Sequence, residues 1–132
     1  MDTPCYCAAV RTAARKTTAL YDAALEPAGV TLAQYSLLRK IERAGTVSLT
    51  ELGRLAELDR STVGRNVKVL EQLRLVRLTS AKDQREAAVK LTSSGAEALR
   101  WAAPLWEDAQ RRVEAALGAG SAEQLRTLAL SL

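Results

Sequence analysis

Apolar and polar residues repeat at helical spacing through most of the chain, and the clearest pattern lies within residues 48–95. A helix is expected from about Asp59 onward, because its apolar residues recur every three or four positions and share one face. These apolar residues are Val63, Val67, Leu70 and Leu73. At about 100° per residue, the opposite face carries Ser61, Arg65, Lys68 and Gln72. The pattern is typical of an amphipathic surface helix, and its polar face also suits the DNA major groove, where Arg binds guanine and Gln binds adenine.

A second helix precedes this one after a very short connection. Ser48 and Glu51 have the spacing of a capping box, which marks a helix start. The apolar stripe that follows consists of Leu52, Leu55 and Ala56. Only residues 57–59 separate the two helices, and Asp59 can cap the second one. Two helices joined so tightly must cross at a steep angle, which predicts a helix-turn-helix.

Two short strands are expected after this pair of helices. Residues 75–79 and 87–91 have the composition of strands, and the residues between them are polar and turn-like. Val47 is expected to add a short edge strand. The hairpin carries Lys82 and Arg85 near its tip, where basic side chains can reach a minor groove, whose negative potential attracts Arg.

Three groups of residues carry a resemblance to a known family: Asp59-Arg60-Ser61-Thr62-Val63, Leu75-Val76, and the spaced pattern Asp83-x-Arg85-x5-Leu91-Thr92-x2-Gly95. In these residues the sequence resembles the MarR family of bacterial winged-helix repressors. The resemblance covers most of the chain and implies a mainly α fold with a small β-wing, in which a winged helix-turn-helix part joins a helical dimerisation region. It also implies that Asp83 braces the wing through a salt bridge and that Arg85 enters the minor groove.

The charge distribution supports contact with double-stranded DNA. The net charge is +4, yet between residues 60 and 90 eight Lys or Arg residues stand against three Asp or Glu residues, which gives +5 and leaves −1 elsewhere. This basic excess is confined to the predicted helix-turn-helix and hairpin, together called the reading head. Such a distribution is typical of a nucleic-acid binder. The residues expected to contact DNA are Arg60, Ser61, Thr62, Arg65, Asn66, Lys68, Gln72, Lys82 and Arg85.

Helices are also expected on both sides of this region. The first covers residues 5–26 and ends at Pro27, because proline cannot continue a helix. A capping box of Thr31 and Gln34 opens another helix that runs to Gly45.

Two more helices are expected at the C-terminal end. A long helix is predicted from Ser93 to Leu117, with a kink or break at Pro104. Ser121 is expected to cap a last helix that runs to Leu132.

The whole chain, residues 1–132, is expected to form a single domain. Residues 30–95 are the predicted DNA-binding part, and residues 1–29 and 96–132 the helical dimerisation part. The terminal helices offer more apolar surface than one small winged helix can cover, which favours packing on a second copy. The resemblance likewise implies a homodimer, and the alternative is a monomer that folds these helices back on itself.

The composition argues against an enzyme. The chain has no histidine, which removes His-based acid–base chemistry and the usual zinc ligand sets. No phosphate-binding loop, dinucleotide-binding glycine pattern or serine-nucleophile motif is present. No run of about 18 apolar residues occurs, and the first residues lack the pattern of a signal peptide, so a cytoplasmic protein is expected.

A signal that controls DNA binding is expected to act at Cys5 and Cys7. A structural disulfide is unusual in a reducing cytosol, whereas a helix N-terminus favours the thiolate that oxidants attack and soft metal ions bind. A partial resemblance to the thiol-based peroxide-sensing branch of the MarR family adds Tyr21, which follows Cys7 by fourteen residues. The sequence departs from that branch at Leu32, where the branch has a second Tyr, and in having no C-terminal Cys. Two incidental cysteines are the alternative, so no cofactor or metal is assigned.

A small-molecule pocket between the dimer helices and the winged helix is the other predicted input. Its lining would include Tyr21, Tyr35, Arg15 and Trp106, all of which suit a packed core equally well. The sequence thus predicts a sequence-specific transcriptional regulator, a repressor, that binds a pseudo-palindromic operator as a homodimer and is released by a signal. The rival hypothesis is a winged helix used only for protein–protein interaction.

Overall fold

The protein is mainly α-helical with a small antiparallel sheet, which confirms the predicted fold class. The computed structural model describes residues 3–79 and 87–132, so Lys82, Asp83 and Arg85 of the expected wing tip lie outside the described residues. In chain order the elements are α1 (Tyr6–Leu25), the 3-10 helix η1 (Glu26–Ala28), α2 (Leu32–Ala44), β1 (Thr46–Ser48), α3 (Leu49–Ala56), α4 (Arg60–Gln72), β2 (Val76–Thr79), β3 (Ala88–Leu91), α5 (Ser93–Leu117) and α6 (Ala119–Ser131).

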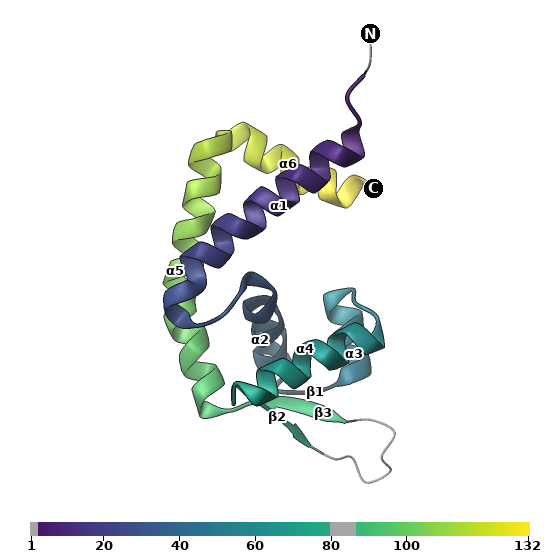
Figure 1. The fold of residues 1–132 in the computed structure, drawn as a ribbon, viewed down its shortest axis with the longest axis vertical. Helices are drawn as coiled ribbons and strands as arrows, with labels where there is room; N and C mark the ends of the chain where they lie inside the picture. The colour runs from purple at the N-terminus through teal and green to yellow at the C-terminus, as the bar shows by residue number, and fades with distance from the viewer. Residues whose placement is uncertain (1–2, 80–86) are drawn as a thin grey trace.

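These elements form two groups that α5 connects (Figure 1). The sheet and helices α2, α3 and α4 lie at one end of the molecule, and α6 and the start of α1 lie at the other. Helix α5 contacts α1 and α6 in one group and α2 and β3 in the other. Helix α1 also contacts α2 directly, so the terminal helices meet the winged helix through both α5 and the end of α1.

The sheet has the strand order β1-β3-β2, with both pairs antiparallel. Val47 of β1 lies opposite Val89 of β3, so the predicted edge strand is confirmed. Leu78 of β2 also lies opposite Val89, and this row faces the core. Arg77, Lys90 and Thr46 form the neighbouring row, which is exposed because successive side chains alternate between faces.

The core lies mainly within the winged helix, and Leu25 of α1 and Leu99 of α5 complete it. Its fully buried large side chains are Leu25, Leu38, Ile41, Leu52, Val63, Val67, Leu70 and Val89. Burial of each such side chain stabilises the fold by about 1.5–3 kcal/mol. Two predicted members are wrong: Leu55 is 38% exposed and Leu73 is 48% exposed. Leu73 is the C-cap of α4, so the helix ends before the periodicity can turn this side chain inward.

Side-chain caps set most of the helix starts. The capping box of Thr31 and Gln34 is present in full at α2, where each side chain accepts the other residue's backbone N–H. Ser48 accepts the N–H of Glu51 at α3, and Asp59 accepts the N–H of Thr62 at α4. The predicted starts of these three helices are therefore confirmed.

The expectations for the C-terminal helices are met only in part. Helix α5 runs through Pro104 as one continuous helix, so the alternative of a break there is wrong. Helix α6 begins at Ala119, directly after Gly118, and no side chain caps it, so the predicted Ser121 cap does not form. Gly118 takes a positive φ of 85°, which glycine adopts readily, and this turn joins the two helices with no intervening loop.

The junction between the sheet and α5 explains why Thr92 and Gly95 belong to the motif noted in the sequence. The Thr92 side chain caps α5 by accepting the N–H of Gly95, and its hydroxyl donates to the carbonyl of Arg74 at 2.7 Å. A Cβ at Gly95 would lie 2.0 Å from the carbonyl oxygen of Leu75. Thr92 and Gly95 therefore hold the start of α5 directly against the end of the α4–β2 turn.

Helices α1, α5 and α6 leave large apolar side chains exposed. They are Tyr6, Val10, Trp101, Leu117, Leu125, Leu128 and Leu130. Helix α6 buries none of its residues in this chain. Within residues 3–79 and 87–132, no helix is long and apolar enough to cross a bilayer.

Candidate nucleic-acid interface

The helix-turn-helix is compact because small and left-handed residues occupy its turn. The N–H of Leu58 donates to the carbonyl of Gly53 at 2.9 Å, and a Cβ at Gly53 would lie 2.9 Å from the Leu58 carbonyl oxygen. Glu57 reverses the chain with a positive φ of 55°. Helix α4 therefore packs on α3 through Val63 and leaves its other side in solvent.

The predicted polar face of α4 is exposed. Its exposed members are Arg60, Ser61, Arg65, Lys68 and Gln72. Thr62 and Asn66 are only partly exposed. Asn66 lines a shallow hollow of about 150 Å³ beside the start of α2, so it lies on a flank of the helix. The structure thus places five of the seven predicted α4 residues on the open face and two beside it.

The N-cap of α4 controls what Ser61 can offer to a ligand. Asp59 Oδ1 accepts both the N–H of Thr62 and the hydroxyl of Ser61, each at 2.7 Å. The backbone hydrogen bond from Thr62, followed by the hydroxyl of Ser61, lowers the pKa of Asp59 to about 2. Because the Ser61 proton is used in this bond, the lone pairs of its oxygen remain available as acceptors.

Two arginines of α4 are held near its first turns. The guanidinium of Arg65 donates to the Thr62 hydroxyl at 3.3 Å. The guanidinium of Arg60 lies over Gly64, where an added Cβ would be 2.9 Å from it. Both side chains stay close to the helix and keep most of their donors free for an anion or a base edge.

A basic pair on the sheet was missed in the set of expected DNA-binding residues. Arg77 of β2 and Lys90 of β3 lie directly opposite each other, and both are exposed. Like charges in register destabilise a strand pair unless an anion lies close by. The alternation of side chains along strands 75–79 and 87–91 places both residues on the outer face of the sheet. Their exposure could therefore have been predicted from the sequence.

The two cysteines lie at the start of α1 and are exposed. Cys5 is the N-cap residue, Cys7 is the second residue of the helix, and neither forms a disulfide. Two positions along a helix turn a side chain by about 200°, so the pair does not share one face. Among the described residues, no group of three or more His, Cys, Asp or Glu side chains is arranged to hold a metal ion.

Tyr21 does not meet Cys7 within one chain. Fourteen residues of helix separate them, or about 21 Å along the axis. The Tyr21 hydroxyl instead donates to Oε1 of Gln110 in α5. Burial raises the pKa of Tyr21, so the hydroxyl stays protonated at neutral pH and links α1 to α5.

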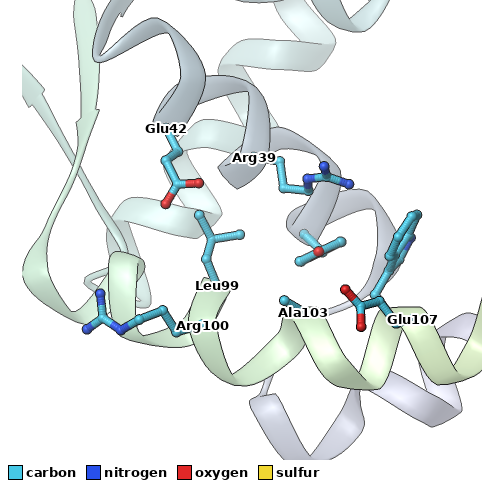
Figure 2. A pocket seen from close by; sticks show the side chains of 8 residues that line it. Arg39, Glu42, Leu99, Arg100, Ala103 and Glu107 are labelled. Carbon is cyan, nitrogen blue, oxygen red and sulfur yellow. The ribbon is translucent and has the colours of Figure 1, made fainter.

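A cavity of about 280 Å³ lies between α2 and α5 (Figure 2). Its lining includes Tyr35 and Trp106, as predicted, but neither Tyr21 nor Arg15. The Arg39 guanidinium lies 5.7 Å from the ring centre of Tyr35 and 5.2 Å from that of Trp106, so a cation covers both aromatic rings. The other lining residues are Glu42, Leu99, Arg100, Ala103 and Glu107.

Comparison with known proteins identifies the family. A model of the MarR family matches residues 28–86. The solved structure of the M. tuberculosis transcriptional regulator MOSR in complex with DNA is 33% identical and covers 98% of this chain and 100% of that chain, with a TM-score of 0.82. The chain belongs to the MarR family. This MarR-family protein is a DNA-binding transcriptional regulator and not an enzyme.

Other relatives agree with this assignment. The uncharacterized HTH-type transcriptional regulator YhbI of Bacillus subtilis (strain 168) is 29% identical over 119 residues, which are 89% of this chain and 77% of that one. A probable transcriptional regulator from Pseudomonas aeruginosa is 25% identical, with a TM-score of 0.85 over 95% of this chain and 94% of that one. The MarR-family regulator described here therefore shares its fold with the solved regulators from M. tuberculosis and Pseudomonas aeruginosa.

Proposed function

We propose that this MarR-family regulator is a cytoplasmic repressor that binds a pseudo-palindromic operator sequence-specifically as a homodimer and releases it on an oxidant or soft-metal signal. The observation that carries the DNA-binding part is the polar face of α4. Ser61, Arg65 and Lys68 are exposed on it, while Val63, Val67 and Leu70 behind them are fully buried. A rigid helix that presents donors and acceptors in this way matches the base edges of a major groove.

Individual roles follow from the hydrogen bonds on this face. Ser61 presents an acceptor, which suits the amino group of adenine or cytosine. Arg65 has free guanidinium donors, which suit guanine, and Lys68 and Gln72 extend the same row. Lys82 and Arg85 are proposed to add minor-groove contacts, and Asp83 is proposed to brace them, on the strength of the family motif.

Homodimer formation is supported by the apolar surface of residues 1–29 and 96–132. Leu125, Leu128 and Leu130 of α6 are all exposed in a single chain, and so is Leu117 at the end of α5. A second copy is the simplest cover for such a surface. Residues 30–95 of each copy would then act as one reading head, and the two heads would bind half-sites about one helical turn apart.

The proposed signal acts at Cys7, with Cys5 beside it. Both thiols are exposed at the N-terminus of α1, where an oxidant or a metal ion can reach them. Peroxide converts a thiolate to a sulfenic acid, and soft metal ions bind it directly. Either event would disturb the start of α1, and the other end of this helix packs on α5 through Tyr21 and so connects to the reading head.

The cavity beside Arg39 supports a second candidate, release by a small aromatic ligand. Its two aromatic rings and its mixture of arginine and glutamate side chains suit a small planar molecule that carries polar groups. Such a ligand would act at the junction of α2 and α5, where the winged helix meets the terminal helices. In this case the response would not depend on either cysteine.

A gel-shift titration on the DNA upstream of the protein's own coding sequence, repeated over a salt series, tests the DNA-binding part. Arg65→Ala is expected to weaken binding by about 1–3 kcal/mol, because a base or phosphate contact is lost. Arg43→Ala removes an exposed arginine at the end of α2, outside residues 60–90 and outside the proposed dimerisation part, and should leave affinity unchanged. Equal behaviour of the two variants would reject α4 as the recognition helix and favour a protein–protein role.

The signal is tested by the same titration with and without peroxide or a thiophilic metal ion. The wild type should lose affinity on treatment. Cys7→Ser should bind DNA and no longer respond, whereas Cys5→Ser serves as the matched control for a change at the helix N-terminus. A response that survives in Cys7→Ser, or none in the wild type, would move the input to the cavity beside Arg39.

A further inference from the structure

Glu71 is an acidic side chain in a place where DNA binding alone would disfavour one. It is the one acidic residue among residues 60–79 and 87–91, which otherwise carry the basic excess of the reading head. A carboxylate there repels phosphate and lowers affinity. Its presence therefore calls for a compensating role.

The structure gives Glu71 one specific partner. Its Oε2 accepts the backbone N–H of Leu78 at 3.2 Å, so a side chain of α4 holds the main chain of β2. Among the residues that the structure describes, strand β2 lies at the edge of the sheet and pairs with β3. In an antiparallel ladder alternate residues turn their N–H groups away from the partner strand, and Leu78 is such a residue.

This contact adds a second fixed point to the connection between α4 and β2. The first is the turn itself, where the N–H of Arg74 donates to the carbonyl of Glu71 and the N–H of Leu75 to that of Leu70. Leu78 lies three residues further along the strand, or about 10 Å from the turn. Pairing with β3 and burial of Val76 also hold β2, and the Glu71 bond adds a direct link from the strand to α4.

We propose that Glu71 is a positioning residue whose carboxylate fixes the angle of the β2–β3 hairpin against α4, so that helix and hairpin meet the DNA together. This inference rests on the proposed function of α4 and the hairpin in DNA binding. The free-energy gain from a correctly aimed hairpin offsets the repulsion between Glu71 and the phosphates. A carboxylate serves well because a charged acceptor forms a stronger bond to an N–H than a neutral one does.

Three substitutions separate the positioning role from the effect of charge. Glu71→Gln keeps the length and an acceptor oxygen but removes the charge. Glu71→Asp keeps the charge but is one methylene shorter and does not reach Leu78. Glu71→Ala removes both the charge and the acceptor.

The first measurement needs no DNA. Hydrogen exchange of the Leu78 amide, followed by NMR, should become faster in the Asp and Ala variants and stay slow in the Gln variant. The Leu75 amide, which donates to the carbonyl of Leu70, is the internal control and should not change. Unchanged exchange at Leu78 in Glu71→Ala would overturn the proposal.

The second measurement is operator affinity at fixed salt. Loss of one exposed hydrogen bond of ordinary net strength predicts about threefold to tenfold weaker binding for Glu71→Asp and Glu71→Ala, while Glu71→Gln should bind at least as tightly as the wild type. Equal tightening in the Ala and Gln variants would mean that Glu71 acts by charge alone and would overturn the proposal. If Glu71→Ala does not fold, the Asp and Gln variants decide the same question. If the wild type binds no operator, the proposed function fails, and exchange at Leu78 still decides whether the contact holds the strand.

Discussion

Gly95→Ala gives the sharpest test of how the winged helix is attached to α5. Alanine is the better helix former, so in an open helix this change would stabilise the protein by up to about 1 kcal/mol. At Gly95, however, the new Cβ would lie 2.0 Å from the carbonyl oxygen of Leu75 and 3.0 Å from its carbonyl carbon. Both are backbone atoms, so the strain cannot be relieved by a side-chain rotation.

The expected cost can be worked out from these contacts. Overpacking of this kind typically costs about 1–3 kcal/mol. Moving the Leu75 carbonyl also endangers the hydrogen bond that it accepts from Thr92 at 3.1 Å, which contributes about 1 kcal/mol. After subtraction of the gain in helix propensity, the net destabilisation of Gly95→Ala is about 1–3 kcal/mol.

Urea unfolding followed by circular dichroism, at one fixed protein concentration, measures this cost as a lower midpoint with an unchanged slope. Gly120→Ala is the matched control. Gly120 lies inside α6 with no atom within 4 Å of an added Cβ, so alanine there should stabilise by a few tenths to about 1 kcal/mol. A Gly95→Ala protein as stable as the Gly120→Ala protein would refute the close approach of α5 to the α4–β2 turn.

Three further predictions concern charge and hydrogen bonding. Because the pKa of Asp59 is lowered to about 2 in the folded state, its contribution to stability should be complete above about pH 4 and be lost as the pH falls toward 2. The urea midpoint should therefore fall less across this pH range in Asp59→Asn than in the wild type. Equal falls in the two proteins would contradict the cap. Arg77→Ala and Lys90→Ala should each weaken binding to all DNA sequences alike and lower the salt slope by about one, if each contacts a phosphate; an unchanged slope would exclude that role. Tyr21→Phe should lower stability by about 1 kcal/mol through loss of the bond to Gln110, and an unaltered urea midpoint would show that this bond adds nothing.

The sequence by itself determined where the helices of the reading head begin and which way they face. Thr31, Ser48 and Asp59 act within three residues of their own positions, so their capping bonds can be inferred without a tertiary model. The spacing of Val63, Val67 and Leu70 likewise defines the buried side of α4, because helical geometry alone relates these positions. The open face that carries Ser61, Arg65 and Lys68 then follows as the remainder of the helix.

Only the tertiary structure decided contacts between residues that are distant along the chain. Tyr21 meets Gln110 across 89 positions, and Arg39 covers the ring of Trp106, yet no periodicity or spacing links these residues in the sequence. The bond from Leu78 to Glu71 joins an edge strand to a helix, and no capping or periodicity rule relates these two positions in the sequence. Position 95 likewise needs glycine because the carbonyl oxygen of Leu75 lies against it. Local periodicity and capping act through the chain itself, whereas these contacts exist only after the elements have packed.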